Sequence, residues 1–180
     1  MKIRNLIFAT CLSLLSTSLG FSSASHAQTA DKLNDVQIAS VVLIADDIDI
    51  SYAKIALAKS KNPEVRTFAE TMVRDHTAVQ EQAAALAKKL GLVPVANDVG
   101  ATLTKNAEKI TADLNGLDGK AFDKYYADNE LAYHKFVNGA VETVFIPNAK
   151  NAEFKALLTT GLGIFKTHQG HAEMMVKSLQ

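Results

Sequence analysis

Apolar residues recur every three or four positions along almost the whole chain after about residue 33, which is the spacing of one face of an α-helix. The first such segment covers about 33 to 60. The second begins at Pro63, which suits a first helical turn, and ends at Gly91. Its apolar stripe consists of Val65, Ala69, Met72, His76, Val79, Ala83, Leu86 and Leu90. These patterns predict two long amphipathic helices.

Two more long helices are predicted in the second half of the chain. One starts near Asp118 or Lys120 and ends at Pro147, and the other covers about 150 to 178. The connection 91–117 carries a short amphipathic stripe of its own, and it is much longer than the roughly 2 to 8 residues usual in up-down bundles. The pattern therefore predicts an all-α, ferritin-like four-helix bundle with a long, partly helical connection between helices 2 and 3.

Histidines interrupt these apolar stripes. His76 and His168 occupy positions where a leucine is expected, and His134 lies along the apolar face of the third long helix. His171 follows His168 by three residues, which places both on one side of a helix. Asp49 lies within the apolar face of the first helix. Near the middle of their helices lie Asp49, His76, His134 and His168, so the sequence predicts one polar layer at mid-height of the bundle.

Two interpretations of this layer are open. A single buried histidine is usually structural, with its ring nitrogens bonded to neighbouring side chains. Four together, with few carboxylates, lack hydrogen-bond partners, and a metal cation would use the free lone pairs. Glu130 and Asp75 are the nearby acids, and each is a candidate ligand, an outer partner of a ligand or a solvated residue.

The spacing of the acids limits the kind of metal. A di-iron bundle uses Glu-x-x-His motifs, and no Asp or Glu in this chain has a histidine three residues later. Glu130 and His134 are four residues apart and could share a face. A site rich in imidazole and poor in carboxylate suits zinc, copper or a mononuclear iron, and no di-iron centre is expected.

The first 27 residues are typical of a bacterial export signal. Lys2 and Arg4 precede an apolar stretch, Leu6 to Leu19, and Ser25-His26-Ala27 offers a cleavage site. The stretch is shorter than the ~20 residues of a spanning helix, and no later segment is long and apolar enough to span. We therefore expect a periplasmic or otherwise exported protein with one domain, 28–180. Cleavage also removes Cys11, the only cysteine.

Composition excludes two classes. A chain that is 48% hydrophobic with no net charge is not disordered. Its 19 basic and 19 acidic residues give no concentrated positive charge, which argues against nucleic-acid binding. The metal ion is the expected partner, while the sequence does not decide between a protein partner and a homo-oligomer.

Four parts of the chain carry a recognisable pattern: Asn62 to Ala69, Met72 to His76, Phe122-Asp123 with Tyr126 to His134, and Leu162 to His168. Together they resemble the exported "domain of unknown function 4142" family. The resemblance covers about 33 to 179, and its most specific part is Met72-Val73-Arg74-Asp75-His76. It implies a ferritin-like four-helix bundle, exported and without an established activity.

The resemblance also places His76, His134 and His168 on the histidine positions of the family. This chain departs from the family pattern at Asp49, where glutamate is expected, and at Gly163, where proline is usual. His171 is an addition.

Two functions follow as hypotheses. The first is an exported bundle that binds a transition metal through His76, His134, His168 and His171, assisted by Asp49 or Glu130, for metal handling or an uncharacterised redox role. The alternative is a non-catalytic envelope or stress protein that binds a partner through its surface, with structural histidines.

Overall fold

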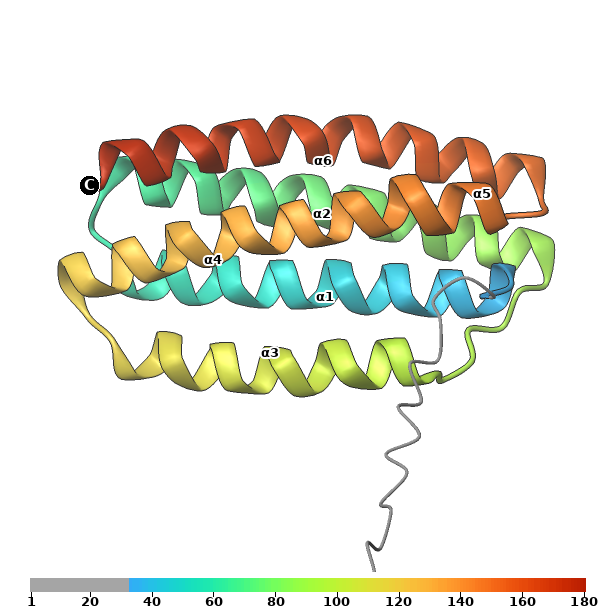
Figure 1. Ribbon diagram of the computed structural model, residues 1–180, viewed down its shortest axis with the longest axis horizontal. Coiled ribbons are helices and arrows are strands. Elements are labelled where there is room, and N and C mark those ends of the chain that lie inside the picture. The colour runs from blue at the N-terminus through green and yellow to red at the C-terminus, as the bar shows by residue number, and fades with distance from the viewer. Residues whose placement is uncertain (1–32) are drawn as a thin grey trace, which may run out of the picture.

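The structure is a computed structural model and describes residues 33–180, all of whose regular elements are helical (Figure 1). The predicted export signal, 1–27, lies outside the described residues. The elements are α1 (Asp35–Lys59), α2 (Pro63–Leu90), α3 (Asp98–Gly116), α4 (Gly119–Ala140), the π-helix η2 (Val141–Phe145), α5 (Ile146–Asn148) and α6 (Ala152–Ser178). The all-α prediction is thus confirmed.

Helices α1, α2, α4 and α6 form a four-helix bundle, and α3 lies along the outer side of α1 (Figure 1). The chain returns along the bundle through α3, so α2 and α4 run in the same direction (Figure 1). This is the predicted ferritin-like connection. The connecting helix was expected to be short, yet it has 19 residues and acts as a fifth helix that covers α1.

The helix ends follow from local chemistry. Asparagine side chains cap the N-termini of α1, α2, α3 and α6, through Asn34, Asn62, Asn97 and Asn151, by accepting hydrogen bonds from free backbone N–H groups. Gly91 ends α2 with a φ of 66°, in the left-handed region that glycine adopts most easily. The predicted start and end of the second helix are confirmed.

The third long helix ends at Asn148, one residue after the predicted end at Pro147. It passes through the π-turn η2, in which the N–H of Ile146 donates to the oxygen of Val141 five residues earlier, and then continues to Asn148. Proline cannot donate a backbone hydrogen bond and its ring crowds the preceding turn. A wider turn just before it lets the helix continue, and it directs Val141 and Phe145 into the core.

Helix α4 buries polar as well as apolar side chains. Phe122 and Tyr126 are buried, whereas Tyr133 and Val137 are only partly buried. The other buried positions of α4 are Asp123, Ala127, Glu130, His134 and Asn138. Polar side chains of α4 therefore point into the middle of the bundle.

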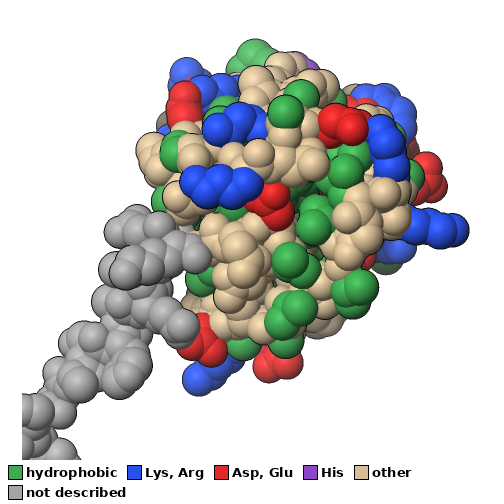
Figure 2. Space-filling view, turned by 90° about the vertical axis from the view of Figure 1, so that its right-hand side faces the viewer, with side chains coloured by type: hydrophobic (Ala, Val, Ile, Leu, Met, Phe, Trp, Pro, Cys, Tyr) green, Lys and Arg blue, Asp and Glu red, His purple; other side chains and the backbone are tan. Residues whose placement is uncertain are grey.

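None of the described helices meets the length and hydropathy of a membrane-spanning segment. One end of the bundle shows positive and negative side chains mixed among apolar ones (Figure 2). His76, His134 and His168 are buried, so they do not contribute to this surface.

Two glycines of α6 provide a test of the packing. Replacing either Gly161 or Gly163 with alanine should raise the free energy of unfolding by about 0.5–1 kcal/mol, because glycine weakens a helix interior. A Cβ at Gly161 would lie 3.6 Å from Phe165 and 3.9 Å from Val79, which is ordinary contact, and one at Gly163 meets nothing within 4 Å. Urea denaturation of both variants measures the gain. A loss confined to Gly161→Ala would mean that α2 and α6 pack more tightly.

Candidate metal centre

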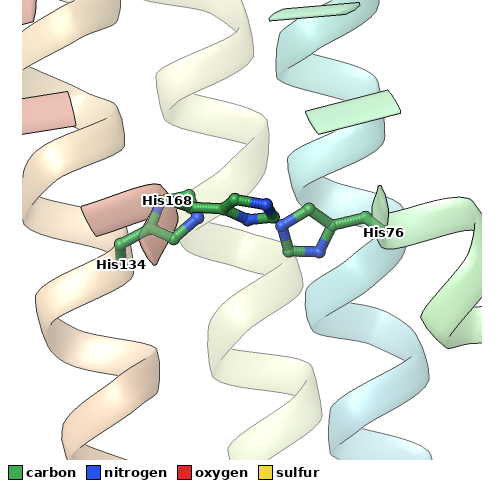
Figure 3. Close-up of side chains that lie close together, drawn as sticks. All are labelled: His76, His134 and His168. Atoms are coloured by element: carbon green, nitrogen blue, oxygen red, sulfur yellow. The ribbon is translucent and has the colours of Figure 1, made fainter. Parts of the chain in front are cut away.

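Three histidines meet in the middle of the bundle, one each from α2, α4 and α6 (Figure 3). His76, His134 and His168 are only 4%, 2% and 1% exposed. Their ring centres are 5.3–5.8 Å apart, and one nitrogen from each lies within 4.8 Å of the others. The three imidazoles therefore converge on one region in the middle of the bundle.

Hydrogen bonds fix the tautomers of two of these rings. His134 Nδ1 lies 2.9 Å from the main-chain oxygen of Glu130, which can only accept, so Nδ1 carries the proton. His168 Nε2 lies 2.9 Å from Oδ2 of Asp75 and donates to that carboxylate. A hydrogen bond from Arg74 is the main reason that the pKa of Asp75 is lowered, which keeps this acceptor charged. Each ring therefore has a lone pair on its other nitrogen.

His76 lies between two aspartates of α1. Its Nδ1 is 2.8 Å from Oδ1 of Asp46, and its Nε2 is 3.5 Å from Oδ2 of Asp49. Burial disfavours the charged ring, but the charge of Asp49 and the hydrogen bond to Asp46 together raise the pKa of His76. Asp46 accepts a hydrogen bond from Nδ1 of His76, and Nε2 of the same ring faces the other histidines and Asp49.

The inward nitrogens lack partners. Among the described residues, the buried atoms without a hydrogen bond include His76 Nε2, His134 Nε2 and His168 Nδ1. A buried polar atom without a partner costs roughly 1–3 kcal/mol, so such atoms are rare. Here three of them converge, each on a ring whose other nitrogen is bonded. The arrangement matches that of metal-binding histidines, whose second nitrogen is held by an oxygen acceptor.

Two carboxylates lie beside this point. Both oxygens of Asp49 and both of Glu130 are buried without a hydrogen bond within the described part of the chain. Asp49 Oδ2 is 3.7 Å from His134 Nε2, and Asp49, Glu130 and His134 form a second group with ligand atoms within 4.8 Å of one another. Burial, and then the charge of Asp49, raises the pKa of Glu130 well above its usual value. A cation here would offset this cost.

Burial also sets the charge of the two remaining histidines. It lowers the pKa of His134, and it lowers the pKa of His168 to about 4. Both rings are therefore neutral at physiological pH, and the neutral ring is the form that binds a metal.

The structure brings together five of the six predicted ligands: His76, His134, His168, Asp49 and Glu130. His171 is the exception, and the expected His168–His171 pair does not form. His171 is exposed and lines a groove between α2 and α6 with Phe68 and Met174. A step of three residues turns a helix about 60° short of a full turn, which carries His171 out of the buried face that centres on His168.

Sequence reasoning missed Asp46, which is 2% exposed. Its position three residues before Asp49 was the available signal, because such residues share a helix face. The expectation of a carboxylate-poor layer is therefore corrected. Three histidines lie with three buried carboxylates, those of Asp46, Asp49 and Glu130.

The model of a protein family described as a domain of unknown function (DUF4142) matches residues 21–175. The chain therefore belongs to the DUF4142 family, as the resemblance in its sequence indicated. No curated protein and no solved structure matches the chain.

Proposed function

We propose that this member of the DUF4142 family binds one transition-metal ion in the middle of its bundle. The proposed ligand atoms are Nε2 of His76, Nε2 of His134 and Nδ1 of His168, with a carboxylate oxygen of Asp49 as the fourth. The observation that carries the proposal is the convergence of three buried ring nitrogens without hydrogen-bond partners.

The surrounding groups support this assignment. Asp46, the Glu130 main-chain oxygen and Asp75 each accept a hydrogen bond from the ring nitrogen that faces away from the centre. Such partners orient the rings and raise their affinity for a metal. The buried carboxylates of Asp49 and Glu130 supply negative charge next to a cation. Three imidazoles with one carboxylate suit zinc, copper or a mononuclear iron.

We further propose that the protein acts outside the cytoplasmic membrane, in metal handling or in an uncharacterised redox step. The support is the sequence of residues 1–27, with its charged start, apolar stretch and cleavage site.

One experiment tests both parts of the proposal. Native mass spectrometry of the untagged protein from a periplasmic extract should show a chain that begins at Gln28 and carries one metal ion. Elemental analysis of the same sample identifies the metal. A chain that retains residues 1–27 would contradict export.

Metal binding fails if the purified chain carries no metal and takes up neither zinc nor copper(II) when these ions are added. That result would favour the alternative of structural histidines in an envelope or stress protein whose surface binds a partner.

A further inference from the structure

A small cavity of about 30 Å³ lies against the histidine layer. His76, His134 and Asp49 are among the residues that line it. The cavity therefore borders three of the residues proposed as metal ligands.

Most of the other residues that line the cavity are apolar, and they include Val42 of α1, Val137 of α4, Val141 and Phe145 of η2, and Phe165 of α6. Asp46, Tyr133 and Asn138 also contribute to the wall. The surface open to the cavity consists of apolar atoms, although polar residues lie behind it. A cavity needs only about 10–15 Å³ to hold a water molecule, but water requires polar partners, and apolar cavities stay dry.

A second cavity of about 20 Å³ lies next to the first. The two share Val42, Val141 and Phe165, and the second also touches Val79 and Gly161. Val141 of the π-turn η2 lines both cavities, so this irregular turn after α4 borders both of them. Two small cavities with mainly apolar surfaces therefore lie side by side in the core, and the first borders the histidine layer.

We infer that these cavities admit a small non-polar gas molecule of two atoms, such as dioxygen, and deliver it to the metal position. Their size excludes larger substrates, and their apolar surface disfavours charged ones. Delivery to a metal rests on the proposed function, whereas occupancy of the cavity does not.

The test uses dissolved dioxygen as the probe and the metal-free, full mature chain. Dioxygen is paramagnetic, so it speeds the relaxation of methyl protons near it. Relaxation of the Val141 methyl groups should be several-fold faster under oxygen than that of Val65, which is equally removed from solvent in α2. Equal rates at the two valines would overturn the inference. A water molecule detected in the cavity by its magnetisation transfer to Val141 would also overturn it.

A filled cavity provides the matched control. Val137→Ile adds one methylene to the cavity wall and should remove most of the oxygen effect at Val141. Val73→Ile makes the same change at a half-buried valine of α2 that does not line the cavity, and it should leave the effect intact. An undiminished effect in Val137→Ile would place the gas elsewhere and sink the inference.

Zinc separates this inference from the proposed function. Zinc uptake without an oxygen effect leaves the metal site standing and removes the gas cavity. An oxygen effect in a chain that binds no metal keeps the gas cavity and removes the delivery to a metal.

Discussion

Replacing His134 with phenylalanine is expected to weaken zinc binding by at least about 100-fold, since even the outer partners of metal ligands contribute about 10- to 100-fold. His134 supplies a nitrogen to both candidate ligand groups, so no other histidine can substitute for it. Phenylalanine keeps an aromatic ring against Phe68 and Tyr133 while it removes both nitrogens. Competition titration with a chromophoric chelator measures the change in affinity.

His171→Phe is the matched control, because it makes the same chemical change at the exposed histidine. It should leave zinc affinity unchanged. Circular dichroism melts of both metal-free variants verify that they fold. Equal affinities of wild type and a folded His134→Phe protein would show that zinc binds elsewhere. Equal losses in both variants would point to non-specific binding by surface histidines.

The fold was largely predictable because strong local signals mark its helix ends. Pro63 and Gly91 bound α2 where expected, since one lacks a backbone donor and the other adopts a left-handed conformation easily. The continuation past Pro147 was not predictable in this way. It depends on a π-turn, and the sequence pattern of a π-turn differs little from that of an α-helix.

The candidate site was only partly predictable, for two reasons. Helix α1 packs against α2, α3 and α4, so it buries more than one stripe, and a one-stripe interpretation overlooked Asp46. Helical spacing also does not decide which of two residues three apart faces the core. His168 lies at the centre of the buried face of α6 and His171 at its exposed edge, a difference set by tertiary packing.

Glu130→Gln is expected to stabilise the metal-free protein at neutral pH. The Glu130 carboxylate is fully buried, its oxygens lack hydrogen bonds, and its pKa is raised well above 4.5. Between 4.5 and that raised pKa, the folded state holds a proton that the unfolded state releases. Wild-type stability therefore falls as pH rises through this range, by about tenfold in the folding equilibrium per pH unit. Glutamine is always neutral and avoids this loss.

The gain of Glu130→Gln over wild type should thus be small near pH 4.5 and grow toward neutral pH. Urea denaturation in the presence of a chelator, repeated from pH 4.5 to 8, measures it. The buried histidines titrate in both proteins, so their contribution cancels in the difference. Glu108→Gln, at an exposed position of α3, is the control and should show no such trend. A Glu130→Gln protein that is less stable than wild type at pH 7 would contradict the claim that the buried Glu130 carboxylate, which lacks a partner, destabilises the metal-free protein.

Zinc should counteract the stabilisation that Glu130→Gln gives to the metal-free protein. In the zinc-saturated protein the Glu130 carboxylate lies beside a cation, which stabilises its charged form, so glutamine removes a favourable interaction. The rise in thermal midpoint caused by zinc should therefore be smaller for Glu130→Gln than for wild type, although the variant starts from the higher value. A rise of the same size in both proteins would mean that the ion does not interact with Glu130, and it would restrict the site to the three histidines and Asp49.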